Sequence, residues 1–219
     1  MCKNRTLSSG KQERKSSTTL RSVAFALQML LSVFLASCAL LPESSSVFLR
    51  AKPALVSRAG LIALIQTYHF NHPADLTEAG LSDRVQGTFQ HQYTLHTISE
   101  VNVIVDKSTH LMWQQAGSSE RLTWMEAKVY IDELNTTQFA DYSDWRLPTL
   151  EELASLLEFR TSPIRPLYLD PLFDTTQTIC WSADVLNSAA NVWFVYFAHG
   201  YVSHTDAESR LYVRAVRSN

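Results

Sequence analysis

Cysteine, glycine and recognisable catalytic motifs are all scarce in this chain. The three cysteines stand at positions 2, 38 and 180 of 219 residues, so no Cys-x-x-Cys pair can supply the clustered thiolates of a zinc site. The chain also has no Gly-x-Ser-x-Gly, His-Glu-x-x-His or phosphate-binding glycine loop. We therefore predict that the protein is not an enzyme and that it uses no cofactor and no metal.

Charge of neither sign dominates the whole chain, but the two signs are unevenly placed. Residues 1–37 carry six basic residues and one acidic residue, whereas the remainder carries 13 basic and 20 acidic residues, a net charge of −7. An acidic body repels nucleic acid and sulfated polysaccharide, so we predict no nucleic-acid partner. The basic head is typical of a targeting segment.

An apolar run over residues 23–41 follows the basic head and contains Leu35-Ala36-Ser37-Cys38. This order resembles the lipobox of bacterial lipoprotein signal peptides, in which small residues precede the lipidated cysteine. It predicts a signal peptide over residues 1–37, lipidation of Cys38 and attachment to a membrane through the lipid. Ala39 favours the outer membrane if the organism has two membranes. The alternative is an uncleaved anchor, because about 19 apolar residues nearly span a bilayer.

The residues after Cys38 divide into three stretches. Residues 38–50 are predicted to be a tether, and residues 51–99 an extension with a helix over 52–67 followed by irregular chain. His69, His72 and His91 lie in or near the irregular part, where polar loop histidines are the expected interpretation and a metal site the alternative. Residues 100–219 are predicted to form the main domain.

Two helices and a set of strands are expected in residues 100–219. Strands are predicted from Val101 and over 111–113. Thr123 with Glu126, and Thr149 with Glu152, are spaced as capping boxes that open two amphipathic helices. Further strands are predicted over 179–183, 192–197, 201–204 and 211–216, with a turn at 198–200. Helices followed by antiparallel strands indicate an α+β fold.

Several segments together resemble one known family. Residues 106–114 are similar to its D-x-x-T-G-L-M-W-Q opening, with His110 where Gly is usual, and residues 122–127 are similar to L-T-W-x-E-A. Residues 142–149 match its hallmark Y-S-D-W-R-L-P-T, and residues 170–173, 180–182, 193–201 and 212–217 match later motifs in order. The chain over about residues 100–218 thus resembles the Legionella collagen-like protein C-terminal domain family, whose function is unknown.

The resemblance implies a C-type lectin-like fold, with two helices packed on a twisted antiparallel sheet. It also implies an extracellular adhesion-type module; the family's namesake is associated with sulfated glycosaminoglycans and with trimers, which leaves a homo-oligomer open. Many members have cysteines where this chain has Ile131 and Ala215, so apolar packing is expected to replace a disulfide here. The acidic body weakens the expectation of glycosaminoglycan binding.

Structural roles are expected for most of the conspicuous motif residues. Trp145 should be buried, Arg146 should form a forked pair with a buried carboxylate, and Asp144 should cap backbone amides. Cys180 is expected to be a small buried hydrophobe, and Asp184, Asp206 and Glu208 to be scattered carboxylates rather than a calcium site. The residues assigned to the structural motif are Asp144, Trp145, Arg146, Pro148, Trp181 and Arg214.

The sequence leaves three hypotheses for function. The first is a non-catalytic envelope lipoprotein with a binding module for glycan or peptidoglycan, in which Tyr142 and Tyr201 serve as stacking groups. The second is an envelope scaffold that binds another protein. The third and least favoured is an enzyme, because Cys180 alone cannot supply paired thiolates.

Overall fold

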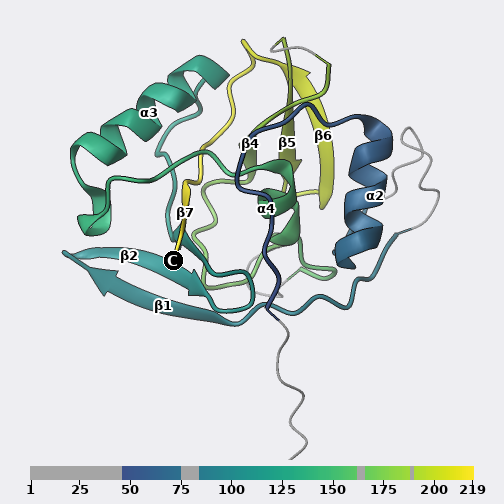
Figure 1. Cartoon of the computed structure of the whole chain (residues 1–219), viewed down its shortest axis with the longest axis horizontal. Helices are drawn as coiled ribbons and strands as arrows, with labels where there is room; N and C mark the ends of the chain where they lie inside the picture. Colours follow the sequence, from purple (N-terminus) through teal and green to yellow (C-terminus); the bar gives the residue numbers. More distant parts are fainter. Residues whose placement is uncertain (1–45, 75–83, 162–165, 188–189) are drawn as a thin grey trace, which may run out of the picture. The chain divides into compact units, whose positions relative to one another are not determined.

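Three α-helices and seven strands occur in the part of the chain that the computed structural model describes, residues 46–74, 84–161, 166–187 and 190–219. Residues 46–219 form one compact unit (Figure 1). The predicted signal peptide, Cys38 and the first part of the tether lie outside the described residues. Within those residues, no helix is long and apolar enough to cross a membrane.

The strands form two antiparallel sheets. One sheet has the order β1 (Tyr93–Ile98), β2 (Val101–Asp106), β3 (Leu111–Gln114) and β7 (Val216–Ser218). The other contains β4 (Ile179–Val185), β5 (Asn191–Tyr196) and β6 (Tyr201–Asp206). The predicted α+β class is confirmed, and residues 100–219 contain the two expected α-helices, but the strands of the described residues form two sheets rather than one.

Each sheet separates two hydrophobic cores. Along β5, Val192 and Phe194 point into one core, whereas Trp193 and Val195 point into the other. The four central residues of this strand, 192–195, are all apolar because both faces of the strand are buried. The core that contains Trp193 and Val195 also contains residues of α2 (Arg58–Tyr68) and α4 (Leu150–Ser155). The core that contains Val192 and Phe194 also contains the buried stripe of α3 (Trp124–Thr136).

Both predicted capping boxes are present. Thr123 accepts a hydrogen bond from the amide of Glu126, whose carboxylate accepts one from the amide of Thr123 in return. Thr149 and Glu152 repeat this arrangement at the start of α4. The two boxes differ in environment, because Glu126 is exposed and Glu152 is fully buried.

The helix predicted over 52–67 begins later, at Arg58. Ser57 caps it, accepting a hydrogen bond from the amide of Gly60 at 3.0 Å. The preceding residues are extended because Leu55 forms a parallel bridge with Val185. The hydrophobic spacing therefore located the helix but not its first turn.

The strand predicted over 211–216 is also wrong as a continuous element. Leu211 and Tyr212 make isolated bridges to Leu122 and Cys180, and a regular strand begins only at Val216. The segment changes partners along its length, which prevents a single ladder from forming. Its apolar residues are nevertheless buried, as the sequence pattern indicated.

The backbone conformation of residue 110 bears on one departure from the family pattern, a His where Gly is usual. His110 has φ 55°, a left-handed conformation that glycine adopts without steric cost. Glycine is usual at this place in the motif, so the backbone conformation accounts for that preference. In this chain the His110 ring stacks on Phe48, with ring centroids 4.9 Å apart.

Candidate functional site

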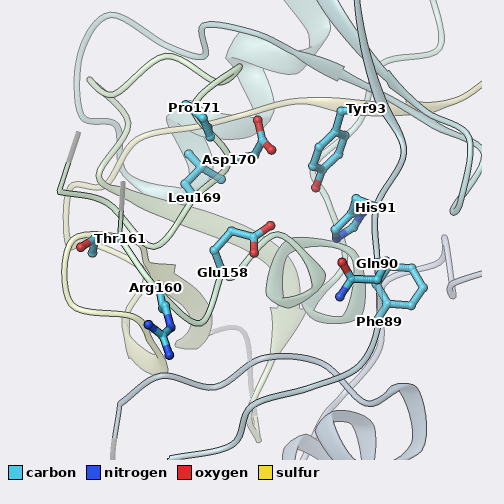
Figure 2. Close-up of a pocket in the computed structure, with 10 residues that line it drawn as sticks. All are labelled: Phe89, Gln90, His91, Tyr93, Glu158, Arg160, Thr161, Leu169, Asp170 and Pro171. Carbon is cyan, nitrogen blue, oxygen red and sulfur yellow. The ribbon is translucent and has the colours of Figure 1, made fainter. Parts of the chain in front are cut away.

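A polar pocket lies beside the carboxyl-terminal end of α4. Its volume is about 380 Å³, and three segments that are distant in sequence form its walls (Figure 2). One segment leads into β1, the second follows α4, and the third precedes β4. The lining residues are Phe89, Gln90, His91, Tyr93, Glu158, Arg160, Thr161, Leu169, Asp170 and Pro171.

Extended backbone before β1 supplies one wall. Successive side chains of extended chain alternate in direction, so Phe89, His91 and Tyr93 lie on the same side. Their rings contact one another in sequence: Phe89 packs edge-on to His91 with centroids 4.8 Å apart, and His91 stacks on Tyr93 at 4.6 Å. Phe173 packs edge-on against the other side of Tyr93 at 5.3 Å. These contacts fix the orientation of the wall.

His91 is buried between two acceptors. Its Nδ1 lies 2.6 Å from Asp106 Oδ2, and its Nε2 lies 2.7 Å from the carbonyl oxygen of Ser155. Both ring nitrogens are thus engaged, and the ring links the pocket wall to Asp106 and to the end of α4. His91 stands in irregular chain as predicted, but its side chain is 6% exposed rather than open to solvent.

Asp106 holds the base of this wall. It is fully buried and also accepts hydrogen bonds from the Thr109 hydroxyl and from the amides of Gln92 and Ser108. Burial acts to raise the pKa of Asp106, but the hydrogen bonds from His91 and Thr109 outweigh it and hold that pKa below its usual range. The D-x-x-T motif thus builds the support behind the pocket.

Two further carboxylates line the pocket itself. Among the described residues, Glu158 makes no side-chain hydrogen bond or ion pair, and Asp170 accepts one hydrogen bond, from the amide of Leu172 at 2.8 Å. Burial raises the pKa of Glu158; the charge of His91 opposes this rise and that of Asp170 adds to it. An unpaired carboxyl group in a partly buried position is a feature typical of functional sites.

The hydroxyl of Tyr93 completes the inner surface. It is buried and has no hydrogen-bond partner in the described part of the chain. Burial raises the pKa of Tyr93 well above its usual value, and the charges of Asp106, Glu158 and Asp170 raise it further, so the phenol stays neutral. A buried hydroxyl without a partner costs stability, unless a water or a ligand satisfies it.

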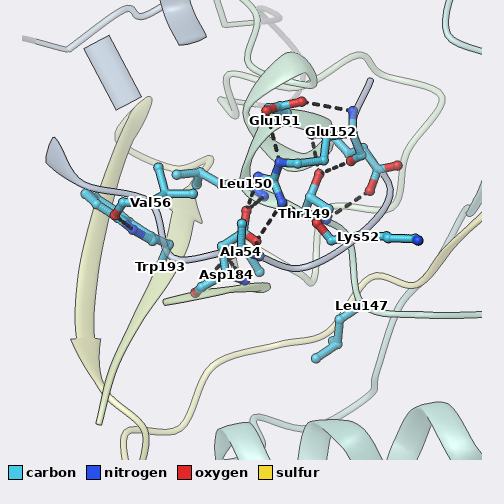
Figure 3. A network of polar contacts seen from close by, with 12 residues as sticks. Lys52, Ala54, Val56, Leu147, Thr149, Leu150, Glu151, Glu152, Asp184 and Trp193 are labelled. Carbon is cyan, nitrogen blue, oxygen red and sulfur yellow. Dashed lines mark hydrogen bonds and ion pairs between the residues drawn. The ribbon is translucent and has the colours of Figure 1, made fainter. Parts of the chain in front are cut away.

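The opposite end of α4 has a different polar cluster (Figure 3). Asp184 is fully buried and accepts hydrogen bonds from the amides of Ala54, at 2.6 Å, and Leu150, at 2.7 Å. Arg50 makes a forked pair with the same carboxylate and also bonds to Glu151. This cluster joins the segment before α2 to α4 and β4, and all of its carboxylates are paired.

The hallmark motif has the structural roles expected of three of its residues. Trp145 is 2% exposed, and its indole donates to the carbonyl of Phe139. Arg146 forms the forked pair with buried Glu152, with both N–O distances at 2.6 Å. Pro148 is buried directly before the α4 cap, and its carbonyl accepts from the amide of Ala183.

Asp144 and Tyr142 share a partner at the surface. Asp144 is exposed and pairs with Arg217 at 2.6 Å, so it does not cap backbone amides as expected. The Arg217 guanidinium also lies over the Tyr142 ring, 3.7 Å from its centroid. One face of the Tyr142 ring is thus already occupied.

Tyr201 lies elsewhere, in an aromatic cluster at the β5–β6 turn. Its ring packs edge-on against Tyr196 at 5.4 Å, and Tyr196 contacts His199 at 4.6 Å. No contact joins Tyr201 to Tyr142 within the described residues. The two predicted stacking groups therefore do not form one site, and neither lines the pocket.

Three motif residues of the later segments are completely buried. The Trp181 indole donates to the carbonyl of Leu122 at 2.8 Å. Arg214 donates to the carbonyl oxygens of Gln114, Gln115 and Asp174 and to the Gln177 side chain. Burial raises the pKa of Cys180 to about 12, as expected for a packing residue rather than a nucleophile.

The remaining sequence candidates do not gather around a metal. Among the described residues, no group of three or more His, Cys, Asp or Glu side chains is arranged to hold one. His69 is exposed at the end of α2. His72 lies outside the helices and strands, as predicted, but it is buried, with Nδ1 2.8 Å from the carbonyl of Ala74.

Sequence reasoning did not identify the pocket. Glu158, Asp170 and Tyr93 come from three distant segments, and none of them belongs to a motif with a known chemistry. A weak signal was present, because Asp106 and Asp170 both open segments that match the family pattern. Nothing in the local sequence indicated that these segments meet.

Comparison with known proteins identifies the family. The model of the Lcl C-terminal domain family matches residues 102–217, more than half of the chain. No curated protein matches the chain. The matched range includes β2, β3, the hallmark motif and both carboxylates of the pocket, and it begins after Tyr93 and His91. The chain belongs to the Lcl C-terminal domain family.

Proposed function

We propose that this member of the Lcl C-terminal domain family is a lipid-anchored protein of the cell envelope with a non-catalytic binding module. The ligand that we propose is a glycan or a peptidoglycan fragment, bound in the pocket at the carboxyl-terminal end of α4. We further propose a C-type lectin-like arrangement of the α+β fold, lipidation at Cys38, and an outer-membrane location in an organism with two membranes. A homo-oligomer is compatible with this function, and nucleic acid is not a proposed partner.

The pocket's unsatisfied inner surface is the observation that carries the proposal. Tyr93 presents a buried hydroxyl without a partner, and Glu158 presents a carboxyl group without a hydrogen bond, among the described residues. Folding leaves such groups unpaired at a cost in stability, so their retention favours a role in binding. Oxygen-rich ligands such as sugars can hydrogen-bond to both groups.

An envelope scaffold that binds another protein is the second candidate. Met125 and Val129 are 59% and 66% exposed and lie one turn apart on α3. Edge strand β1 also exposes Leu95, which is 47% accessible. Exposed apolar side chains and an open strand edge favour protein contacts.

A binding screen tests the proposal. The full-length protein, purified in detergent, is applied to an array of glycans and peptidoglycan fragments and compared with Glu158→Ala and Tyr201→Ala. We expect saturable binding that Glu158→Ala abolishes and Tyr201→Ala retains. The reverse pattern would place the site at the β5–β6 turn, and a blank array would favour the scaffold. Turnover of any bound glycan would overturn the non-catalytic role, and a mass spectrum of the purified protein without a lipid on Cys38 would overturn the lipid anchor.

A further inference from the structure

The inner surface of the pocket consists of hydrogen-bond acceptors. The carboxylate groups of Glu158 and Asp170 and the hydroxyl of Tyr93 point toward a common space (Figure 2). They reach it from three segments, so the arrangement is a product of the fold and not of one acidic stretch of sequence. The Tyr93 hydroxyl is buried and unpartnered within the described chain, which marks this space as incomplete without a further group.

Among the described residues, the neighbouring cations do not fill this space. Both ring nitrogens of His91 are engaged, one with Asp106 and the other with the carbonyl of Ser155. Arg160 is exposed, and Figure 2 shows its guanidinium directed away from the carboxylate of Glu158. The remaining polar lining residues, Gln90 and Thr161, are neutral and exposed. The centre of the pocket therefore combines two acidic groups with a neutral phenol.

We infer that this pocket binds a primary ammonium group of its ligand, with Glu158, Asp170 and Tyr93 as the three acceptors. An ammonium group has three N–H donors and no acceptor, which complements this set. The inference rests on the proposed function, because it names the chemical class of ligand for the same pocket. An amino sugar and an amine-bearing peptide of the cell wall share this chemistry.

Charge and ligand number support an ammonium group over a metal ion. The chain after residue 37 has a net charge of −7, which attracts cationic ligands over a distance of about 10 Å at moderate salt. Calcium takes about six to eight oxygen ligands, whereas two carboxylates and a phenol provide few. Burial raises the pKa of Glu158, the charge of His91 opposes this rise and that of Asp170 adds to it, so a positive charge beside both carboxylates agrees with this environment.

Calorimetric titration with matched probes tests the inference. The full-length protein is titrated with a glucosamine tetrasaccharide and with its fully N-acetylated counterpart, and then with a lysine-containing stem peptide and its Nζ-acetylated counterpart. We expect at least one amine probe to bind at least tenfold more tightly than its acetylated partner. Glu158→Gln should weaken amine binding at least tenfold, and Asp170→Asn and Tyr93→Phe should weaken it severalfold. Glu208→Gln, which makes the same charge change on an exposed turn, is the control.

The outcomes separate the inference from the proposed function. Equal affinity within both probe pairs, or unchanged amine affinity in folded Glu158→Gln, overturns the ammonium site and leaves a glycan-binding module standing. Binding of the amine peptide without any glycan retains the ammonium site and overturns the glycan ligand. Loss of affinity in Glu208→Gln equal to that in Glu158→Gln assigns the effect to net charge and overturns the site. Absence of binding by every probe overturns both.

Discussion

Acidic side chains lie near both ends of helix α4, but their hydrogen bonding and ion pairing differ between the two ends. At the amino-terminal end, Glu151, Glu152 and Asp184 are all paired with arginine or with backbone amides. At the carboxyl-terminal end, the Glu158 carboxyl group is without a hydrogen bond in the described chain and the Tyr93 hydroxyl is without a partner. Paired carboxylates fix the chain in place, whereas unpaired ones leave binding capacity available. The contrast separates residues that hold the fold together from residues that are free to bind.

The largest expected effect comes from breaking the paired end. Asp184→Asn removes the charge that Arg50 and two backbone amides face, so we expect the free energy of unfolding to fall by about 3 kcal/mol. Urea unfolding measures the change. Asp170→Asn is the matched substitution at the other end and should cost less than about 1 kcal/mol, because Asp170 accepts a single amide hydrogen bond. Equal losses would contradict the contrast.

A smaller effect is expected at the helix cap. Thr149→Ala removes the cap of α4 and a hydrogen bond from the Thr149 hydroxyl to the carbonyl of Arg50, so about 2 kcal/mol should be lost. Thr123→Ala removes the same type of cap from α3, where Glu126 is exposed, and should cost about 1 kcal/mol. Thermal unfolding of the two variants compares them directly. A larger loss of stability in Thr123→Ala than in Thr149→Ala would show that burial of the Thr149–Glu152 capping box contributes nothing to stability.

The smallest effect on stability is expected at Glu158, and it should depend on pH. Because the folded-state pKa is raised, ionising Glu158 costs more in the folded protein, and wild-type stability falls as the pH rises through that pKa. His91, Asp170, Tyr93 and Arg160 are the other titratable groups that line the pocket. Near pH 4 the Glu158→Gln variant and the wild type should differ by less than about 0.5 kcal/mol.

Above that pH, Glu158→Gln should become progressively more stable than the wild type. Urea midpoints measured across the pH range provide the test, with Glu208→Gln as the exposed control. A constant difference between wild type and Glu158→Gln at every pH would show that the carboxyl group is not held in an unfavourable environment.

The pKa of Asp106 is shifted in the opposite direction, so its effect on stability has the opposite pH dependence. Its lowered pKa predicts stability that is present above about pH 4 and is lost as the pH falls through the folded-state pKa.

Local sequence rules located the helices of the family domain and several of its strands. The spacing of Thr149 and Glu152 fixed the start of α4, and the presence of Glu152 also supplied the buried carboxylate that Arg146 was expected to meet. These features succeed because the interacting residues are six or fewer positions apart. The alternating residues of β2 and the apolar run of β5 likewise predicted strands.

Strand β1 was not predicted because its turn lacks the usual signal. Ile98 pairs with Val101, so Ser99 and Glu100 form a two-residue turn, and both have positive φ values. Asn-Gly or Asp-Gly is the preferred sequence for such a turn. The pocket was missed for a different reason, since Tyr93, Glu158 and Asp170 meet only through tertiary contacts.

The segment from Val47 to Val56 has a mechanical consequence. Tension applied to the chain before Ser46 enters the folded unit through this strip, whatever holds the upstream residues. Three contacts hold this segment in succession. The amide of Val47 donates to the carbonyl of Ser108, Arg50 pairs with Asp184, and the amide of Val56 donates to the carbonyl of Val185. Such a pull must break these backbone hydrogen bonds and the Arg50–Asp184 ion pair before it reaches α2.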